Sequence, residues 1–327
     1  MDFAVERPIR PDKYFGNDVA LATTLPSQKS NAGWLGHGAI FALGGVLYLL
    51  CRDYPAELPA WLPWEFCWPE YLAAALSLYW FARGLACMEV GARPPLWRSI
   101  SFVLGVVSLY AVLQTRIDYY ALHMFFVHRA QHFVLHHIGA FLVALGASGP
   151  VQWAGMPGFL RPIVASWPVK RLVDIIQHPA VAPVLFVGLI YLWLIPAIHT
   201  RVMLDVRLYN LMNESMAVDG LFFWCLILDP RPCPPARIGS GLRALLVIAV
   251  EPFQMVLGAI LSLSSSDFYP VYRICGRIWN ITALSDMHYG GLIIWLPSTL
   301  TSFAGVIAVL VAMRLNDEAA EREESIQ

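Results

Sequence analysis

Three histidines spaced four residues apart, His128, His132 and His136, are the residues best placed to do chemistry. Residues four apart advance by about 40° around a helix, so these side chains form one narrow stripe, which Met124 extends by a turn. Imidazole and thioether groups together suit copper, especially Cu(I), whereas imidazoles alone would also suit zinc, iron or nickel. Because the rise from His128 to His136 is about 12 Å, we expect two adjacent sites or a relay.

The elements that must position this stripe are membrane-spanning helices. The chain has 327 residues, 58% of them hydrophobic and 14% charged, against about 45–50% and about 25% in soluble domains. Apolar runs of about 20 residues, long enough to cross about 30 Å of hydrocarbon, recur along it. We predict an all-α, polytopic transmembrane bundle of seven or eight spans. The eight runs are about Trp34–Cys51, Pro69–Met88, Ile100–Thr115, Ala121–Ala147, Ala180–Ile198, Leu208–Leu228, Leu242–Leu263 and Gly291–Met313.

The basic residues orient this bundle. With eight spans and a cytoplasmic N-terminus, most of the 22 Lys and Arg residues fall on the inner side, as the positive-inside rule expects, and both termini are cytoplasmic. The expected organisation is a cytoplasmic segment over residues 1–33, a bundle over 34–313 and an acidic cytoplasmic tail over 314–327. No cleavable signal peptide is visible in the polar first 33 residues.

Orientation places most of the histidines toward the outer surface. The fourth span descends from His123, and the ends of two other spans bring His199 and His288 to the same level. Asp286 is expected at the exit or partner surface beside His288. We predict that the metal ligands come from His123, Met124, His128, His132, His136, His199, Met203 and His288.

Polar residues inside the predicted spans form a second group of candidates. Such residues are costly in a membrane and tend to face a cavity or a partner within the bundle. Gln131 lies within the histidine run, and Arg129 is expected to neutralise Glu214 or Glu251 across the bundle or to gate anion or proton movement. His137 is expected to serve in helix packing or to face the cytoplasm.

Other kinds of site find little support. The six cysteines have no C-x-x-C pair; Cys51, Cys67 and Cys275 are expected outside, where they could form a disulfide or stay free. There is no P-loop, G-x-G-x-x-G, H-E-x-x-H or G-x-S-x-G motif. Basic residues do not cluster, so we expect no nucleic-acid partner.

Four short runs, in order along the chain, resemble the CtaG-type cytochrome c oxidase assembly factors. That family has an H-M-x-Q-H helix, a W-H-x-P segment, an F-W helix and a D-Q-x-x-G-G-x-x-x-W opening of the last span. The corresponding runs here are His128–Leu135, Leu192–Ala197, Gly220–Trp224 and Asp286–Trp295. Arg129, Leu194 and Met287 replace the family's Met, His and Gln, which suggests that the ligand set has shifted toward His199.

The resemblance implies a non-enzymatic factor that assembles a haem-copper cytochrome c oxidase in the bacterial plasma (inner) membrane. Its expected partners are an oxidase subunit and membrane lipid, and its expected metal is copper, held or transferred on the outer side. Two alternatives stay open on the residues alone. Histidines on facing helices also ligate haem in electron-transfer proteins, and the stripe could line the path of a metal or proton permease.

Overall fold

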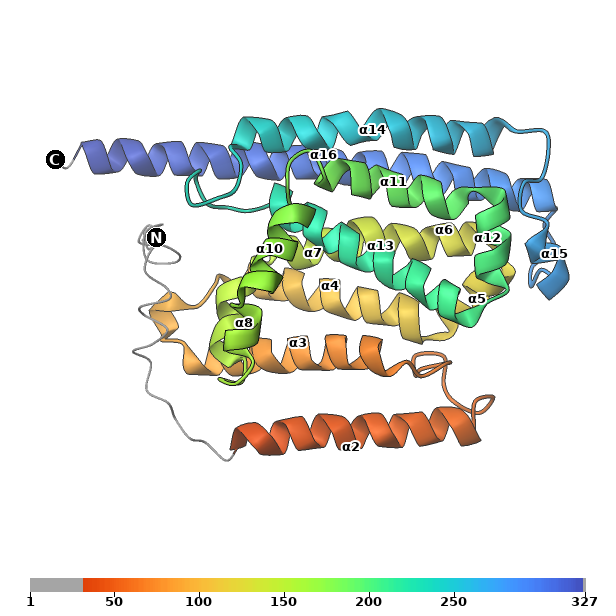
Figure 1. Ribbon diagram of the computed structural model, residues 1–327, viewed down its shortest axis with the longest axis horizontal. Coiled ribbons are helices and arrows are strands. Elements are labelled where there is room, and N and C mark those ends of the chain that lie inside the picture. Colours follow the sequence, from red (N-terminus) through yellow and green to blue (C-terminus); the bar gives the residue numbers. More distant parts are fainter. Residues whose placement is uncertain (1–31, 326–327) are drawn as a thin grey trace, which may run out of the picture.

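The computed structural model describes residues 32–325, and every regular element in that range is helical (Figure 1). Fifteen stretches are α-helical, η2 (Val90–Ala92) is a short 3-10 turn and η3 (Val134–Ile138) is a π-helical turn. The α-helices are α2 (Ala32–Asp53), α3 (Trp68–Cys87), α4 (Leu96–Gln114), α5 (Arg116–His123), α6 (Phe125–Phe133), α7 (Gly139–Leu145), α8 (Gly149–Gly155), α9 (Arg161–Val164), α10 (Trp167–Ile176), α11 (Ala182–Leu194), α12 (Pro196–Met203), α13 (Val206–Ile227), α14 (Ser240–Leu263), α15 (Val271–Cys275) and α16 (Ala283–Glu324).

The long helices run side by side along the long axis of the molecule (Figure 1). Helix α14 packs along α16, α16 along α6, and α4 along α7. The short helices α5, α12 and α15 gather at one end of the bundle, and α8 and α10 lie toward the other (Figure 1). The histidine-rich segment from α6 to η3 therefore lies among several neighbours.

The number of spans depends on how bent helices are counted. In the described residues, four helices are long and apolar enough to cross a membrane, namely α2 over Gly33–Asp53, α4, α14 and α16. Two bent pairs raise the number to as many as six: Phe125–Leu145 with α8, bent by 75°, and α11 with α12, bent by 74°. Helices α3 and α13 lie alongside these (Figure 1), so seven or eight spans stays a prediction.

The helix that carries the histidines begins later than the sequence pattern predicts. Helix α5 ends at His123, Met124 is extended with φ −134° and ψ 121°, and α6 begins at Phe125. The carboxylate of Asp286 accepts hydrogen bonds from the backbone N–H groups of Phe125 and Phe126, at 3.1 and 2.9 Å. These bonds satisfy amides that a helix start leaves free. The expected unbroken span from Ala121 is therefore wrong at its beginning.

A π-helical turn interrupts the same helix between the second and third histidines. The N–H of Gly139 donates to the carbonyl of Val134, five residues earlier, instead of the usual four. Trp224 Nε1 donates to the carbonyl of His136 at 3.1 Å, and Gly220 lets α13 approach this backbone, because a Cβ there would lie 2.6 Å from the same oxygen. The four-residue spacing therefore does not keep His136 on the face of His132.

The predicted span from Ala180 to Ile198 is also broken, and the cause is Pro196. Proline lacks a backbone N–H and its ring clashes with the preceding turn, so it is accepted at a helix start but not inside. Helix α11 ends at Leu194, Ile195 is extended, and Pro196 opens α12. The bend turns α12 across the end of the bundle, with His199 buried on it.

Two apolar clusters form the core of the bundle. One surrounds α6 and includes Phe125, Leu135, Met212 and Tyr272. The other packs around α7 and α13 and includes Phe186, Phe223 and Trp224. Because the interior is filled by side chains of this size, the polar groups between the clusters are held in defined positions.

Close backbone contact between α3 and α8 gives a test of this packing. A Cβ at Gly84 would clash with the carbonyl oxygen of Val151, whereas a Cβ at Gly188 in α11 would meet nothing within 4 Å. Gly84→Ala should lower the free energy of unfolding by about 1–3 kcal/mol, as overpacking does. Gly188→Ala should leave it unchanged or raise it by up to about 1 kcal/mol. Tryptophan fluorescence during heating in detergent measures both, and equal melting temperatures would contradict the helix contact.

Candidate functional site

Two of the three stripe histidines meet at the end of the bundle where α5, α12 and α15 gather. The Nε2 atoms of His128 and His132 lie 3.1 Å apart. His128 Nδ1 lies 2.7 Å from the hydroxyl of Tyr272 in α15, and the same hydroxyl lies 3.0 Å from Nε2 of His199 in α12. All four side chains are buried. We call His128, His132, His199 and Tyr272 the outer-end cluster, after the end of the bundle that the sequence predicts to face outward.

Neighbouring side chains complete the wall of the outer-end cluster. Asn213 Oδ1 lies 3.0 Å from His132 Nε2, and the sulfur of Met203 lies 3.9 Å from the Tyr272 hydroxyl. His199 Nδ1 lies 2.9 Å from the carbonyl of Trp193. Pro196 makes the last contact possible, because its bend brings the end of α11 back toward α12. The cluster thus joins imidazole, phenol, amide and thioether groups from four helices.

The third stripe histidine belongs to a separate pair. His136 Nε2 lies 3.1 Å from a carboxylate oxygen of Asp219 in α13, and its ring stacks on Phe186 at 3.9 Å between centroids. His137 is equally buried beside it, in agreement with a packing role and not with a cytoplasm-facing one. The predicted stripe is therefore split, with His128 and His132 on one side of the π turn and His136 on the other.

The remaining predicted ligands do not converge on the outer-end cluster. His123 is half-buried and its Nδ1 lies 2.9 Å from the carbonyl of Gly276. His288 Nε2 lies 2.8 Å from the carbonyl of Ser264. Met124 is fully buried in a small apolar cluster with Ala121 and Val127. Only Met203, of the methionines proposed, lies beside the cluster.

The expected ion pair of Arg129 with Glu214 or Glu251 is not formed. The Arg129 guanidinium lies over the ring of Phe125, 5.2 Å from its centroid, and its Nε and Nη2 atoms have no hydrogen-bond partner among the described residues. Glu251 instead accepts hydrogen bonds from Thr299 and Ser302. The Arg129 side chain is buried in the bundle interior.

Gln131 connects to a carboxylate near the same end of the bundle. Its Nε2 donates to Asp118 at 2.6 Å and to the carbonyl of Val112 at 2.8 Å, and Tyr209 donates to Asp118 at 2.7 Å. Burial raises the pKa of Asp118 to about 6, against the opposing effect of these two donors. Gln131 therefore holds helices together and is not a ligand in this arrangement.

Asp286 is fully buried, contrary to its expected place at an exit surface. Besides capping α6, its carboxylate accepts a hydrogen bond from Arg277 Nε at 3.0 Å, within an ion pair whose arginine side chain is 12% exposed. One carboxylate therefore links the start of α16, the segment after α15 and the start of the histidine helix.

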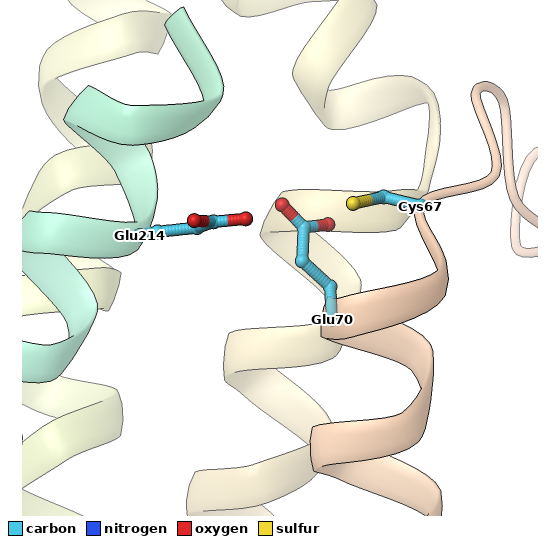
Figure 2. Close-up of side chains that lie close together, drawn as sticks. All are labelled: Cys67, Glu70 and Glu214. Carbon is cyan, nitrogen blue, oxygen red and sulfur yellow. The ribbon is translucent and has the colours of Figure 1, made fainter. Parts of the chain in front are cut away.

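A second group of potential ligands, which the sequence patterns missed, lies between α3 and α13. Cys67, Glu70 and Glu214 point toward one another (Figure 2), and one ligand atom from each lies within 4.8 Å of the others. In the described residues it is the one such group of His, Cys, Asp and Glu. Gln114 positions it by donating to Glu70 at 2.7 Å. Cys67 and Glu70 are three residues apart at a helix start, and this spacing was the one feature of the sequence that could have indicated the group.

The thiol of this group is in its neutral form. Burial, with added repulsion from Glu70, raises the pKa of Cys67 to about 11. All six cysteines are free in the structure, so the considered disulfide among Cys51, Cys67 and Cys275 is not formed.

The fold and the site together define a helical membrane protein with a buried histidine and tyrosine cluster at one end. The sequence matches the family model described as cytochrome c oxidase caa3 assembly factor (Caa3_CtaG) over residues 77–315. The chain therefore belongs to this family, and the resemblance inferred from its motifs is confirmed. No solved structure matches the chain.

Curated relatives come from mycobacteria. An uncharacterized protein of Mycobacterium bovis and one of Mycobacterium tuberculosis are each 30% identical over 266 residues, which cover 75% of this chain and 38% of theirs. An uncharacterized protein of Mycobacterium leprae is 26% identical over 272 residues, covering 77% of this chain and 40% of its own. The chain therefore matches about two fifths of the length of these relatives.

The capping role of Asp286 predicts a large effect on stability. Asp286→Ala removes two amide acceptors and leaves Arg277 without its buried counterion, so the free energy of unfolding should fall by about 3–5 kcal/mol. Asp53→Ala, which breaks an exposed pair with Arg52, is the matched control and should change it by less than about 0.5 kcal/mol. Thermal unfolding in detergent measures both. A similar, small effect of the two variants would contradict the capping role.

The raised pKa of Asp118 predicts a pH dependence. Its pKa is about 6 in the folded protein and about 3.9 in an unfolded chain, so the native state binds more protons between these values. Stability from this group is then present below about pH 4 and is lost as the pH rises to about 6, by about 3 kcal/mol in all. Melting temperatures between pH 4 and 7 should fall less in Asp118→Asn than in the wild type. Parallel curves would refute the assignment.

Proposed function

We propose that this chain is a non-enzymatic assembly factor for a haem-copper cytochrome c oxidase, and that its outer-end cluster holds copper for transfer. The membership of the family supports the assembly role. The protein acts in the bacterial plasma (inner) membrane, where its partners are lipid and an oxidase subunit that receives the metal. It has no nucleic-acid partner in this proposal.

The observation that carries the copper proposal is the approach of two imidazole nitrogens. Nitrogens that share one tetrahedral ion at about 2.0–2.1 Å each lie about 3.3 Å apart. The Nε2 atoms of His128 and His132 are 3.1 Å apart in a buried site, so small side-chain shifts admit an ion between them. Their ring planes are nearly perpendicular, at 88°.

The surroundings suit copper that has to be released again. Met203 offers a thioether beside the Tyr272 hydroxyl, and soft, few ligands favour Cu(I). Because the hydrogen bonds that connect His199 to His128 run through the Tyr272 hydroxyl, His199 can join or leave the ligand set as the ion moves. A closed cage of four strong ligands would resist transfer, whereas two imidazoles with optional third ligands permit it.

The proposed topology places this site on the outer side. Helices α3 and α13 are counted as spans along with the four apolar helices and the two bent pairs, which makes eight and returns both termini to the cytoplasm. The end with α5, α12 and α15 then faces outward (Figure 1). His123 and His288 lie near this end, where they make the first contacts with an incoming ion or the receiving subunit.

A paired substitution tests the copper site. His128→Gln with His132→Gln should weaken Cu(I) binding by more than about tenfold, since even outer-shell changes cost metal sites about 10–100-fold. His178→Gln, whose ring bonds only the backbone N–H of Ala180, is the control and should bind as the wild type. Competition with a colorimetric Cu(I) chelator, on protein in detergent under reducing conditions, measures the affinity.

The same variants distinguish the alternatives in cells. Loss of oxidase activity in the paired variant, with whole-cell copper unchanged, is expected of an assembly factor. Unchanged Cu(I) affinity and unchanged oxidase activity would remove the copper proposal. A Soret band in the purified wild type would indicate haem ligation instead, and a change in accumulated metal would indicate a permease.

A further inference from the structure

A small cavity lies beyond the outer-end cluster, where polar side chains meet a mostly apolar lining that includes Phe133, Ile190 and Met216. Its volume is about 20 Å³, and the residues lining it include Arg129, His132, His136, His137 and Gln254. Each of these five side chains is at most 5% exposed. In the described part of the chain, each also has at least one buried polar atom without a hydrogen-bond partner: Arg129 Nε and Nη2, Nδ1 of the three histidines, and both amide atoms of Gln254. We call this cavity the polar chamber.

The hydrogen-bond partners assign the tautomers of the outer-end cluster, beginning at a carbonyl. The oxygen of Trp193 can only accept, so His199 Nδ1 carries the proton and donates to it. His199 Nε2 is then an acceptor in the neutral ring. The hydroxyl of Tyr272 therefore donates its proton to His199 Nε2.

The assignment continues from Tyr272 to the polar chamber. Because its one proton is used on His199, the Tyr272 oxygen accepts from His128 Nδ1–H. His128 Nε2 is then an acceptor, so His132 Nε2–H donates to it and to Asn213 Oδ1. His132 Nδ1 is left with a lone pair, and it is one of the unpartnered atoms of the polar chamber.

The same reasoning assigns the hydrogen-bonding roles of the other polar residues that line the polar chamber. With Asp219 as a carboxylate, His136 Nε2–H donates to it, and His136 Nδ1 is a second unpartnered lone pair. Arg129 supplies N–H donors that have no acceptor among the described residues, and Gln254 supplies an NH₂ donor. The polar chamber therefore presents two acceptors, on His132 and His136, and donors on Arg129 and Gln254; His137 Nδ1 and Gln254 Oε1 are further polar atoms of its lining.

We propose that the polar chamber binds one ordered water molecule, which accepts from Arg129 and Gln254 and donates to His132 and His136. A water needs about 10–15 Å³ of such volume and two to four polar partners, and the chamber provides about 20 Å³. Two donors and two acceptors match the four hydrogen bonds of a water. The proposal concerns the protein without metal and does not depend on copper binding.

Other small ligands match this lining less well. A metal ion would meet the guanidinium of Arg129, a fixed positive charge in a medium that screens poorly. A halide would meet the lone pairs of His132 and His136, which repel an anion. Only a ligand that both accepts and donates satisfies every wall of the chamber.

The water joins two separate hydrogen-bonded systems into one network. The chain of bonds then runs from the carbonyl of Trp193 through His199, Tyr272, His128 and His132, across the water, and through His136 to Asp219. All its members are buried or nearly so. The protein thereby has a continuous hydrogen-bonded network between the outer-end cluster and the middle of α13.

The test combines tautomer assignment with direct observation of the water. In nanodiscs, ¹⁵N-histidine NMR of the whole chain should report Nδ1–H tautomers for His128 and His199 and Nε2–H tautomers for His132 and His136. A high-resolution structure of the wild type should have a water within hydrogen-bond distance of Arg129, Gln254, His132 and His136. An Nδ1–H tautomer of His132, or a chamber without this water, would overturn the proposal.

Two glutamine variants test whether the water depends on the lining of the polar chamber. Gln254→Leu should lose the water and shift the Nδ1 resonances of His132 and His136, and Gln177→Leu, whose amide bonds the carbonyl of Phe222, should retain both. If Gln254→Leu does not fold, the wild-type measurements decide alone. Bromide soaked into crystals should give no anomalous signal in the chamber, because a bound halide there would replace the proposed ligand.

Discussion

Polar groups inside an apolar bundle must be satisfied by the protein itself, and this constraint organises the structure around α6. The helix starts where Asp286 accepts hydrogen bonds from two backbone N–H groups, and it widens where the Trp224 indole N–H donates to the His136 carbonyl. Each irregularity in the helix is thus matched by a side chain from another element. The histidines are held in place by these matches as much as by the apolar core.

The same constraint explains why the histidines form two groups. Four-residue spacing on an ideal helix would give one stripe, but the π turn between His132 and His136 redirects the third ring to Asp219. The first two rings, before the turn, keep their regular spacing and meet. π turns are frequent at functional sites, and here one separates the pair of His128 and His132 from the pair of His136 and Asp219.

Much of this could be predicted from the sequence. Composition and apolar runs were enough to predict an all-helical bundle, and spacing was enough to bring His128 and His132 together. The positions of the helix breaks could be predicted only in part. The break at Pro196 has a local cause, which the prediction of one span over Ala180–Ile198 overlooked. The break at Met124 depends on Asp286, which is distant in the chain. Partners across helices, such as Tyr272 for His199 or Glu70 for Glu214, leave no periodic signal, so the Arg129 pairing with a carboxylate was wrong and the group of Cys67, Glu70 and Glu214 was missed.

Helix α16 has 42 residues, which at 1.5 Å per residue makes it about 63 Å long, roughly twice the thickness of the hydrocarbon layer. Its first turn carries Asp286, and its final turns, rich in glutamate, extend past Met313 into water. One continuous helix therefore joins the exposed C-terminal turns to the buried start that carries Asp286. A force on these last turns would be transmitted along the helix to Asp286, which caps the start of the histidine helix.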